Sequence, residues 1–290
     1  MKAMLRFMLL AVLLTALTAF FRQSAAAADG IRLRTAEGVI TVSEEEYLAG
    51  ALAAEMPASF PTEALKAQAV AIRSFVAASA PRHEDADVCA SSACCLAWYS
   101  EDERRAAWGD YYYVNQSRIE QAIAETADEI LCYGDEPALA VFHAASLGST
   151  ESSADVWGAV PYLVSVESPE SAAAFPSLVQ ERFVSYAELA AALDVTLPLI
   201  EAVEYDDAGR VRCVTVDGQA FSGLTLRGAL DLSSTDLSLA PVCGGYVFSV
   251  RGRGHGLGMS QYGAAVYAEQ GMDYREILAH YYPNTTIITE

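Results

Sequence analysis

The chain has 290 residues, of which 38 are acidic and 18 basic, so its formal net charge is −20 at pH 7. Its length and its 53% hydrophobic content are enough for one large domain or two modest ones with a packed core. The strong negative charge argues against a nucleic-acid-binding protein, because phosphates would be repelled rather than neutralised.

The N-terminus predicts an export signal. Lys2 and Arg6 precede a mostly apolar run over residues 7–21, and the small-residue stretch "SAAAADG" follows it. A basic start, a short apolar core and an Ala-x-Ala exit are typical of signal peptides. The run is shorter than the ~20 residues of a comfortable membrane span. We therefore expect residues 1–28 to be a signal or an uncleaved membrane anchor, and residues 29–290 to form one large extracytoplasmic domain.

A hairpin and a helix are expected first in the mature chain. Residues 31–43 alternate in polarity around a Glu-Gly turn, which predicts a β-hairpin. Ser43 and Glu46 have the spacing of a capping box and predict the start of a helix over residues 44–56. Pro57 ends that helix, because the residue before a proline is disfavoured in the helical region.

Glu55 lies in the last turn of this expected helix, in the apolar segment "LAGALAAEMP". The negative end of the helix dipole and the apolar surroundings both disfavour an ionised carboxylate there. A carboxyl that keeps its proton near neutral pH suits general-acid catalysis on a glycosidic oxygen. The alternative is an ordinary glutamate that faces solvent near a helix end.

A second helix is expected over residues 62–80, opened by Pro61. Its apolar residues recur on one face, whereas Lys66 and Arg73, seven positions apart, share another. These two cations are either solvated helix charges or contacts for an anionic ligand.

Four potential metal ligands follow within thirteen residues, namely His83, Cys89, Cys94 and Cys95. Thiolates and an imidazole suit tetrahedral zinc. An exported chain can also form disulfides, so a Cys89–Cys95 bridge is an equal alternative. The cysteines elsewhere in the chain are expected to be small buried hydrophobic residues.

The rest of the chain predicts mixed helices and strands. Strands of about six residues joined by tight turns must pair antiparallel, so the fold class is α+β. Capping boxes at Ser185–Glu188 and Asp273–Glu276 predict two further helix starts. Helices are expected within residues 111–128 and 224–232, and strands over residues 129–133, 139–146, 200–206, 210–218 and 246–252.

The segment "RGRGHGLGMSQYGA", residues 251–264, alternates glycines with larger residues. Glycine at such spacing lets a second backbone or a ligand approach closely. We expect a substrate-contacting loop in which His255, Ser260 and Gln261 offer hydrogen bonds. The alternative is a structural turn before a helix.

The chain contains three motifs in this order, namely "AAEMPASFPTEALKAQAVAIRSF", "FHAASLGSTESSADVWGAVPYLVSVESP" and "GRGHGLGMSQYGA". Together they resemble the stage II sporulation protein D family, which shares a domain with amidase enhancers. The resemblance covers nearly all of residues 30–290. It implies a lytic transglycosylase that cleaves peptide-free peptidoglycan strands between MurNAc and GlcNAc, leaving 1,6-anhydro ends. It also implies a membrane anchor, and a partner amidase or endopeptidase during engulfment of the forespore.

The resemblance further assigns roles to single residues. The family's catalytic glutamate falls on Glu55, and a pair of N-terminal helices would flank the active-site cleft. Some members bind zinc in the region that matches His83, Cys89 and Cys95, and Cys94 stands where one such member has a second histidine.

Other residues are expected to contact the glycan. Lys66 and Arg73 would meet the lactyl carboxylates of a peptide-free strand, and Ser146 is what remains of a hydroxyl-rich loop. A hydrolase would need a second carboxylate, for which Asp155 is the nearest candidate, whereas a transglycosylase can use the 6-hydroxyl of muramic acid itself.

Two other functions compete with this one. The first is a non-catalytic wall-binding module that stimulates a separate amidase. The second is a zinc amidase that uses the His83 cluster, which is the weaker alternative because thiolate-rich zinc sites are mostly structural.

Overall fold

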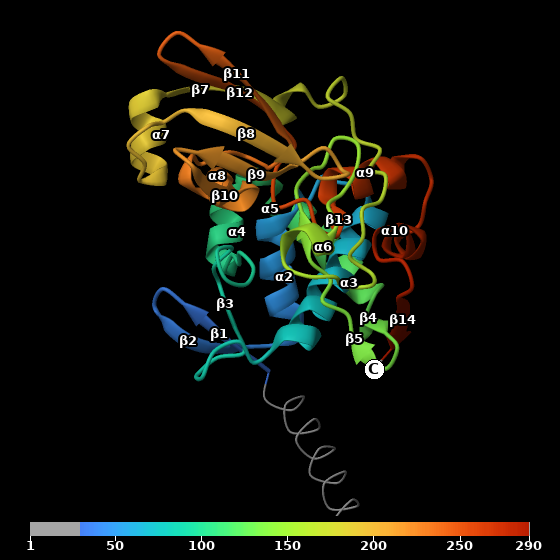
Figure 1. Cartoon of the computed structure of the whole chain (residues 1–290). Helices are drawn as coiled ribbons and strands as arrows, with labels where there is room; N and C mark the ends of the chain where they lie inside the picture. The colour runs from blue at the N-terminus through green and yellow to red at the C-terminus, as the bar shows by residue number, and fades with distance from the viewer. Residues whose placement is uncertain (1–29, 290) are drawn as a thin grey trace, which may run out of the picture. The chain divides into compact units, whose positions relative to one another are not determined.

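The computed structural model describes residues 30–289, and the chain divides into two compact units (Figure 1). Within the described residues, unit 1 comprises residues 30–55 and 80–109, and unit 2 comprises residues 56–79 and 110–289. The export signal expected in residues 1–28 lies outside the described residues. None of the helices in residues 30–289 has both the length and the apolarity that a bilayer crossing requires.

Unit 1 opens with the expected hairpin. Strands β1 and β2 pair antiparallel from Ile31↔Val42 to Thr35↔Gly38, and Gly38 has the positive φ of 133° that follows the tight turn. The short strand β3 then pairs parallel with β1. The elements of unit 1 are β1 (Ile31–Thr35), β2 (Gly38–Val42), α2 (Glu44–Glu55), β3 (Val88–Cys89) and α4 (Glu101–Trp108).

The start of α2 confirms half of the predicted capping box. Ser43 Oγ accepts a hydrogen bond from the Glu46 backbone N–H at 3.2 Å. The Glu46 carboxylate does not reach back to the cap, because both of its oxygens accept from the buried guanidinium of Arg104 at 3.0 Å. A complete capping box, which the sequence analysis did not single out, opens α4 at Ser100 and Glu103. The Glu46–Arg104 ion pair thus ties α2 to α4.

The first part of unit 2 is built around helix α3 (Thr62–Ser79), whose residues from Ala64 to Phe75 are all buried except Lys66. It packs against β4, α5, α9 and α10. Antiparallel β14 and β5 flank β4 in one sheet. The elements are α5 (Tyr112–Ala124), β4 (Glu129–Tyr133), β5 (Glu136–Pro137), α9 (Gln261–Glu269), α10 (Tyr274–Tyr281) and β14 (Thr286–Thr289).

The second part of unit 2 holds two antiparallel three-stranded sheets, in the orders β11-β12-β7 and β10-β9-β8 (Figure 1). Their inward-facing side chains, with those of α7 and α8, form one apolar cluster that includes Val184, Val214 and Phe248. The elements are β7 (Val179–Ser185), α7 (Tyr186–Leu193), β8 (Ile200–Tyr205), β9 (Val211–Val216), β10 (Gln219–Ser222), α8 (Gly223–Ala229), β11 (Leu237–Val242) and β12 (Gly245–Arg251).

Unit 2 also contains four short elements, namely β6 (Phe142–His143), α6 (Ser153–Val156), the 3-10 helix η2 (Pro176–Leu178) and β13 (Met259–Ser260). The strand predicted over residues 139–146 is wrong in extent, because β6 keeps only two residues. Leu147, with φ of +57°, turns the chain directly after this segment.

The α+β class with mostly antiparallel strands is confirmed. Among the strands named in residues 30–289, only the short pairs β1–β3 and β6–β13 are parallel. Helices α2 and α3 belong to different units, so the cleft expected between them stays a prediction.

Candidate active site and metal centre

Glu55 lies in the last turn of α2, as the sequence predicted, and is its last residue, since the helix ends one residue before the predicted end. Its side chain is half-buried. Its Oε1 accepts a hydrogen bond from the backbone N–H of Ala97 at 2.7 Å. Burial raises the pKa of the Glu55 carboxyl above 4.5, and the Ala97 hydrogen bond opposes this because it stabilises the carboxylate. Burial has the larger effect, so the carboxyl holds its proton at higher pH than a free glutamate does.

The hydrogen bond to Glu55 is positioned by a glycine in α2. A Cβ on Gly50 would lie 2.2 Å from Trp98 Nε1 and 2.5 Å from the carbonyl oxygen of Tyr99. The Tyr99 N–H also donates to the Gly50 carbonyl at 3.1 Å. Only glycine lets residues 97–99 lie this close to the helix, and this closeness places the Ala97 N–H against the carboxyl of Glu55.

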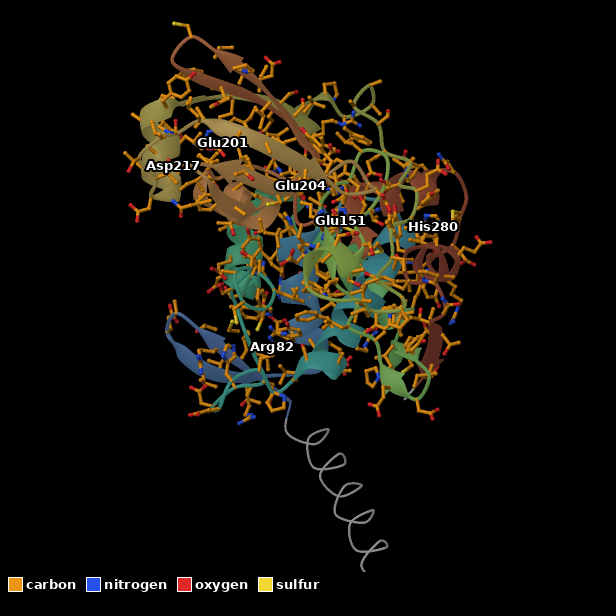
Figure 2. The ribbon with its side chains drawn as sticks, viewed as in Figure 1. Arg82, Glu151, Glu201, Glu204, Asp217 and His280 are labelled. Carbon is orange, nitrogen blue, oxygen red and sulfur yellow. The ribbon has the colours of Figure 1, made fainter. Side chains whose placement is uncertain are left out.

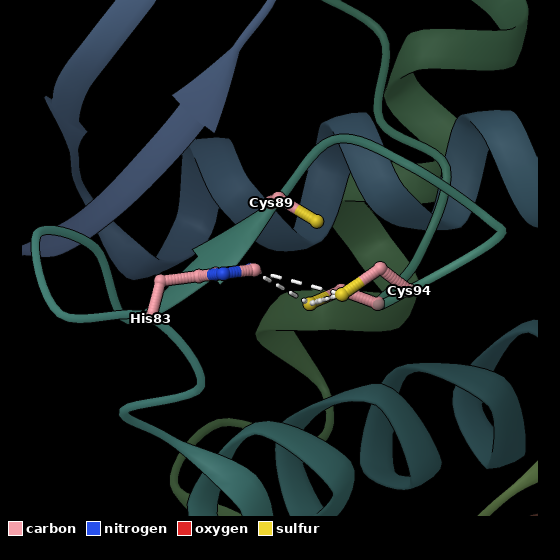
Figure 3. A group of neighbouring side chains, drawn as sticks. His83, Cys89 and Cys94 are labelled. Atoms are coloured by element: carbon pink, nitrogen blue, oxygen red, sulfur yellow. Dashed lines mark hydrogen bonds between the residues drawn. The ribbon is translucent and has the colours of Figure 1, made fainter.

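The four predicted metal ligands come together in unit 1. One ligand atom from each of His83, Cys89, Cys94 and Cys95 lies within 4.8 Å of all the others. His83 Nε2 lies 3.8 Å from Cys94 Sγ and 3.7 Å from Cys95 Sγ, and the two sulfurs are 3.8 Å apart. Figure 3 shows the imidazole and the cysteine sulfurs directed at a common centre.

These distances fit zinc. With Zn–S near 2.3 Å and Zn–N near 2.0–2.1 Å, neighbouring ligand atoms of a tetrahedron lie about 3.6–3.8 Å apart. Three thiolates and one imidazole are also a usual donor set of a closed structural zinc site. The four residues can therefore hold zinc with little rearrangement.

The thiols of the cluster differ in acidity. Burial raises the pKa of Cys89 to about 12, and the hydrogen bonds that its thiol donates to Cys95 and Cys94 add to this. A hydrogen bond from Cys89 lowers the pKa of Cys94, and the Arg82 guanidinium acts in the same direction. A bound divalent cation would deprotonate all of them, because the thiolate is the metal ligand.

The alternative disulfide is not formed in the structure, where Cys89 and Cys95 are free thiols. The expectation that the isolated cysteines are buried is correct for Cys132 but wrong for Cys243, which is exposed. Cys243 lies between antiparallel β11 and β12, where the chain reverses at the surface of the sheet.

The glycine-rich segment lies in unit 2, and a second stretch of backbone accounts for its alternation. Gly252, Gly254 and Gly258 have φ of 74°, 107° and 67°. A Cβ on each would come within 1.9 to 2.7 Å of residues 141–145. The close approach that these glycines permit is therefore to the protein's own chain, which favours the structural alternative over a wall for substrate.

Ser146 is buried and lies in a polar network. Its Oγ is 2.5 Å from His143 Nε2 and accepts from Arg210 Nη2 at 3.3 Å. Burial lowers the pKa of His143 well below 6.5, so the imidazole is neutral. This placement favours a structural role for Ser146 over the predicted contact with glycan.

The side chains of Ser260 and Gln261 also form hydrogen bonds with other residues of the protein. Ser260 caps α9 and donates to the buried carboxylate of Glu170 at 2.6 Å, and the side chain of Gln261 donates to Gln68 at 3.3 Å. His255 is only partly buried, and desolvation lowers its pKa to about 4. Of the three residues, His255 alone keeps a partly exposed side chain.

Lys66 and Arg73 do not share one environment. The Lys66 ammonium pairs with Glu63 at 2.8 Å and with Glu125 at 2.5 Å. Arg73 is buried and donates to the backbone carbonyls of Thr126 and Glu129 at 2.9 and 3.0 Å. Arg73 thus joins α3 to the chain around the start of β4, a structural role that the sequence analysis did not predict.

Figure 2 labels Glu151, a residue that the sequence analysis missed. Glu151 forms a buried charged pair with Arg210 in unit 2. Glu151 is 2% exposed and Arg210 1%, and Arg210 Nε lies 3.6 Å from Glu151 Oε2. Burial and then the neighbouring Asp206 carboxylate raise the pKa of Glu151 to about 7. Glu151 sits among serines and a threonine in "STESSADVWG", and neither its burial nor its partners could be read from that pattern.

The sequence of the chain is similar to those of known proteins. A family model described as "Stage II sporulation protein" matches residues 13–133. Stage II sporulation protein D of Bacillus amyloliquefaciens is 36% identical over 253 residues, which cover 84% of this chain and 73% of the relative. The chain belongs to the stage II sporulation protein D family. The protein of the same name from Bacillus subtilis is 34% identical, over 88% of this chain and 77% of the relative.

The chain is also similar to a protein with a different name. The chain is 27% identical to an amidase enhancer of Bacillus subtilis, over 83% of this chain and 40% of that longer protein. The resemblance drawn from the sequence motifs is thereby confirmed, and sporulation is the process to which the relatives' names point.

Proposed function

We propose that this protein is a lytic transglycosylase that cleaves peptide-free glycan strands of peptidoglycan between MurNAc and GlcNAc during sporulation. The observation that carries the proposal is the carboxyl of Glu55, which is half-buried, has a raised pKa and is held by the Ala97 N–H. A carboxyl with a raised pKa keeps its proton at higher pH than a free glutamate does, so it can donate that proton and take it back afterwards.

In the proposed reaction Glu55 acts first as acid and then as base. Its proton goes to the glycosidic oxygen, the bond to the anomeric carbon of MurNAc breaks, and the leaving GlcNAc gains a hydroxyl. The carboxylate then takes the proton of the MurNAc 6-hydroxyl while that oxygen bonds to the anomeric carbon. Glu55 ends protonated again, and the products are a free 4-hydroxyl and a 1,6-anhydro ring, with no water consumed.

Zinc would be structural. His83, Cys89, Cys94 and Cys95 would hold it, and bound zinc would supply a cross-link between the strand β3 and the residues 94–95 that lead to Ala97. Because four protein ligands close a tetrahedral site, the cluster offers no open position for a reacting water. This donor set disfavours the zinc-amidase alternative.

The other site residues follow from this function. We propose that His255 contacts glycan, because it is the predicted hydrogen-bonding residue that stays partly exposed. The protein would act outside the cytoplasm, with an amidase or endopeptidase that removes the stem peptides first. The predicted N-terminal segment, residues 1–28, would export or anchor it.

The test is product chemistry. Purified protein incubated with peptide-free glycan strands should yield anhydro-MurNAc ends detectable by mass spectrometry. Glu55→Gln keeps the shape of the side chain but cannot transfer a proton, so it should lose cleavage while melting at about the parent temperature. A Glu55→Gln protein that cleaves within a few-fold of the parent would refute the role of Glu55.

A second function is favoured by the relative named amidase enhancer. A wall-binding module that stimulates a separate amidase would create no new glycan ends. Parent protein that binds strands and raises the rate of an added amidase, without forming anhydro ends, would support this function instead.

A further inference from the structure

The hydroxyl of Tyr47 is buried in unit 1 without a hydrogen-bond partner. Tyr47 lies near the start of α2 and is 1% exposed. Its Oη makes no hydrogen bond with any residue in the described range, 30–289. A buried polar group that lacks a partner is costly, and native proteins keep few such groups. The Tyr47 hydroxyl is therefore a hydrogen-bond donor that needs an acceptor.

The groups that act electrostatically on this hydroxyl belong to the cysteine cluster and to the candidate active site. Burial raises the pKa of the Tyr47 phenol, and negative charge on Cys95, on Glu55 and on Cys89 raises it further, in that order. All four residues lie in unit 1. The hydroxyl therefore lies near the cluster, and Cys95 is the ligand that interacts with it most strongly.

The partners of the Cys95 sulfur are themselves potential metal ligands. Cys95 Sγ lies 3.7 Å from His83 Nε2 and 3.8 Å from Cys94 Sγ, and it accepts a hydrogen bond from the Cys89 thiol. Zinc would bind the Nε2 lone pair and displace the thiol protons, so none of these three residues could then donate to Cys95. A buried thiolate without a donor is unfavourable.

The exposed ligand Cys94 differs from Cys95 in this respect. The Arg82 guanidinium donates a hydrogen bond to Cys94 and lowers the pKa of its thiol. Arg82 is not a metal ligand, so it can still donate when zinc is bound. Cys95 is buried, and a donor for its thiolate has to come from the protein interior.

We propose that Tyr47 supports the zinc site by donating a hydrogen bond from its hydroxyl to the zinc-bound thiolate of Cys95. The hydroxyl needs an acceptor and the thiolate needs a donor. Glu55 is the weaker candidate acceptor, because its effect on the hydroxyl is smaller and its Oε1 already accepts from the Ala97 N–H. Hydrogen bonds to metal ligands orient those ligands and raise metal affinity. The inference rests on the proposed zinc site.

Zinc affinity of the full chain tests the proposal. Tyr47→Phe removes only the hydroxyl, and competition with a zinc chelator of known affinity measures the affinity of each protein. Tyr47→Phe should bind zinc roughly 10-fold more weakly than the parent, because a lost hydrogen bond to a metal ligand typically lowers metal affinity about 10- to 100-fold. In excess chelator, Tyr47→Phe should melt at or above the parent temperature, since it no longer buries an unpaired hydroxyl.

Tyr246→Phe is the matched control. Tyr246 is also buried, at 6% exposed, but it lies in unit 2 and its hydroxyl accepts a hydrogen bond from the Ile200 N–H at 2.9 Å. The same chemical change there should lower the melting temperature and leave the zinc affinity as in the parent. The two variants thus separate loss of a hydrogen bond to the metal site from a general loss of stability.

Cobalt(II) in place of zinc provides a spectroscopic readout that packing alone would not change. A hydrogen bond to a bound thiolate lowers the energy of its lone pairs. The thiolate-to-cobalt charge-transfer band should therefore move to longer wavelength in Tyr47→Phe and stay at the parent position in Tyr246→Phe.

Three results would overturn the proposal. An unchanged zinc affinity and cobalt band in Tyr47→Phe would show that the hydroxyl has no part in holding the metal. Unchanged metal binding with an altered pH profile of glycan cleavage would assign the hydroxyl to Glu55 instead. A parent chain that binds no zinc would refute the zinc site and this inference together, whereas a parent chain that binds zinc but does not cleave glycan would refute only the transglycosylase.

Discussion

Replacing Gly50 by alanine should damage both the fold of unit 1 and the candidate active site. Alanine is the better helix former and would by itself stabilise α2 by about 1 kcal/mol. The added Cβ, however, would stand 2.2 Å from Trp98 Nε1 and 2.5 Å from the Tyr99 carbonyl. Overpacking of this kind costs about 1–3 kcal/mol, and backbone cannot move aside as cheaply as a side-chain end. We expect a net loss of stability of about 0–2 kcal/mol, toward the upper end because backbone is among the atoms displaced.

A matched control exists in α8. Gly228 also lies inside a helix, but a Cβ there would meet nothing within 4 Å. Gly228→Ala should therefore stabilise the protein by about 0.5–1 kcal/mol, and urea denaturation of the two variants measures the difference.

The same variant should also affect cleavage. Displacing residues 97–99 would move the Ala97 N–H away from Glu55, so Gly50→Ala should lose activity beyond its loss of folded protein. A Gly50→Ala protein as stable as Gly228→Ala, or fully active, would refute the close packing of residues 97–99 on α2.

Further predictions concern the glycine loop, the metal and pH. Gly256 has φ of +83°, and a Cβ there would lie 2.9 Å from the Arg210 guanidinium carbon, so Gly256→Ala should destabilise the fold by about 1–3 kcal/mol in urea titrations. Elemental analysis should find one zinc per chain, lost in Cys95→Ser and retained in Cys243→Ser; equal zinc in both variants would exclude the cluster as the site. The acid form of Glu55 starts the reaction, and the pKa of Glu55 is raised, so activity should persist above pH 4.5. The rate should fall as the pH rises through the raised pKa of Glu55. A rate that rises with pH throughout would contradict the general-acid role.

Local chemistry explains what could be predicted from the sequence. Because His83, Cys89, Cys94 and Cys95 lie within one short segment, their side chains cannot lie far apart. The cluster of potential ligands could therefore be predicted from the sequence. Glu55 was visible because Pro57 fixes the end of its helix, and the apolar neighbours indicate burial.

The remaining features depend on partners that are distant in the sequence. Glu46 satisfies the pattern of a capping box, yet Arg104, 58 residues away, takes its carboxylate. The glycines of residues 252–258 indicated a close approach, but only the fold shows that residues 141–145 are what approaches. Glu151 acquires its proton affinity from burial beside Asp206, and no local motif encodes that contact.

The interleaving of the two units has a consequence for synthesis and for inheritance. The chain leaves unit 1 at Glu55 and re-enters it at Ala80, and unit 2 is completed only when β14, at Thr286–Thr289, pairs with β4. During synthesis, α2 leaves the ribosome before residues 80–109 of its own unit. The hydrogen bond between the Ala97 N–H and the Glu55 carboxyl can therefore form only after that later segment has been made. Neither unit is encoded by one uninterrupted stretch of the gene. Recombination could not transfer one unit without interrupting the other, so we expect the two units to be inherited together.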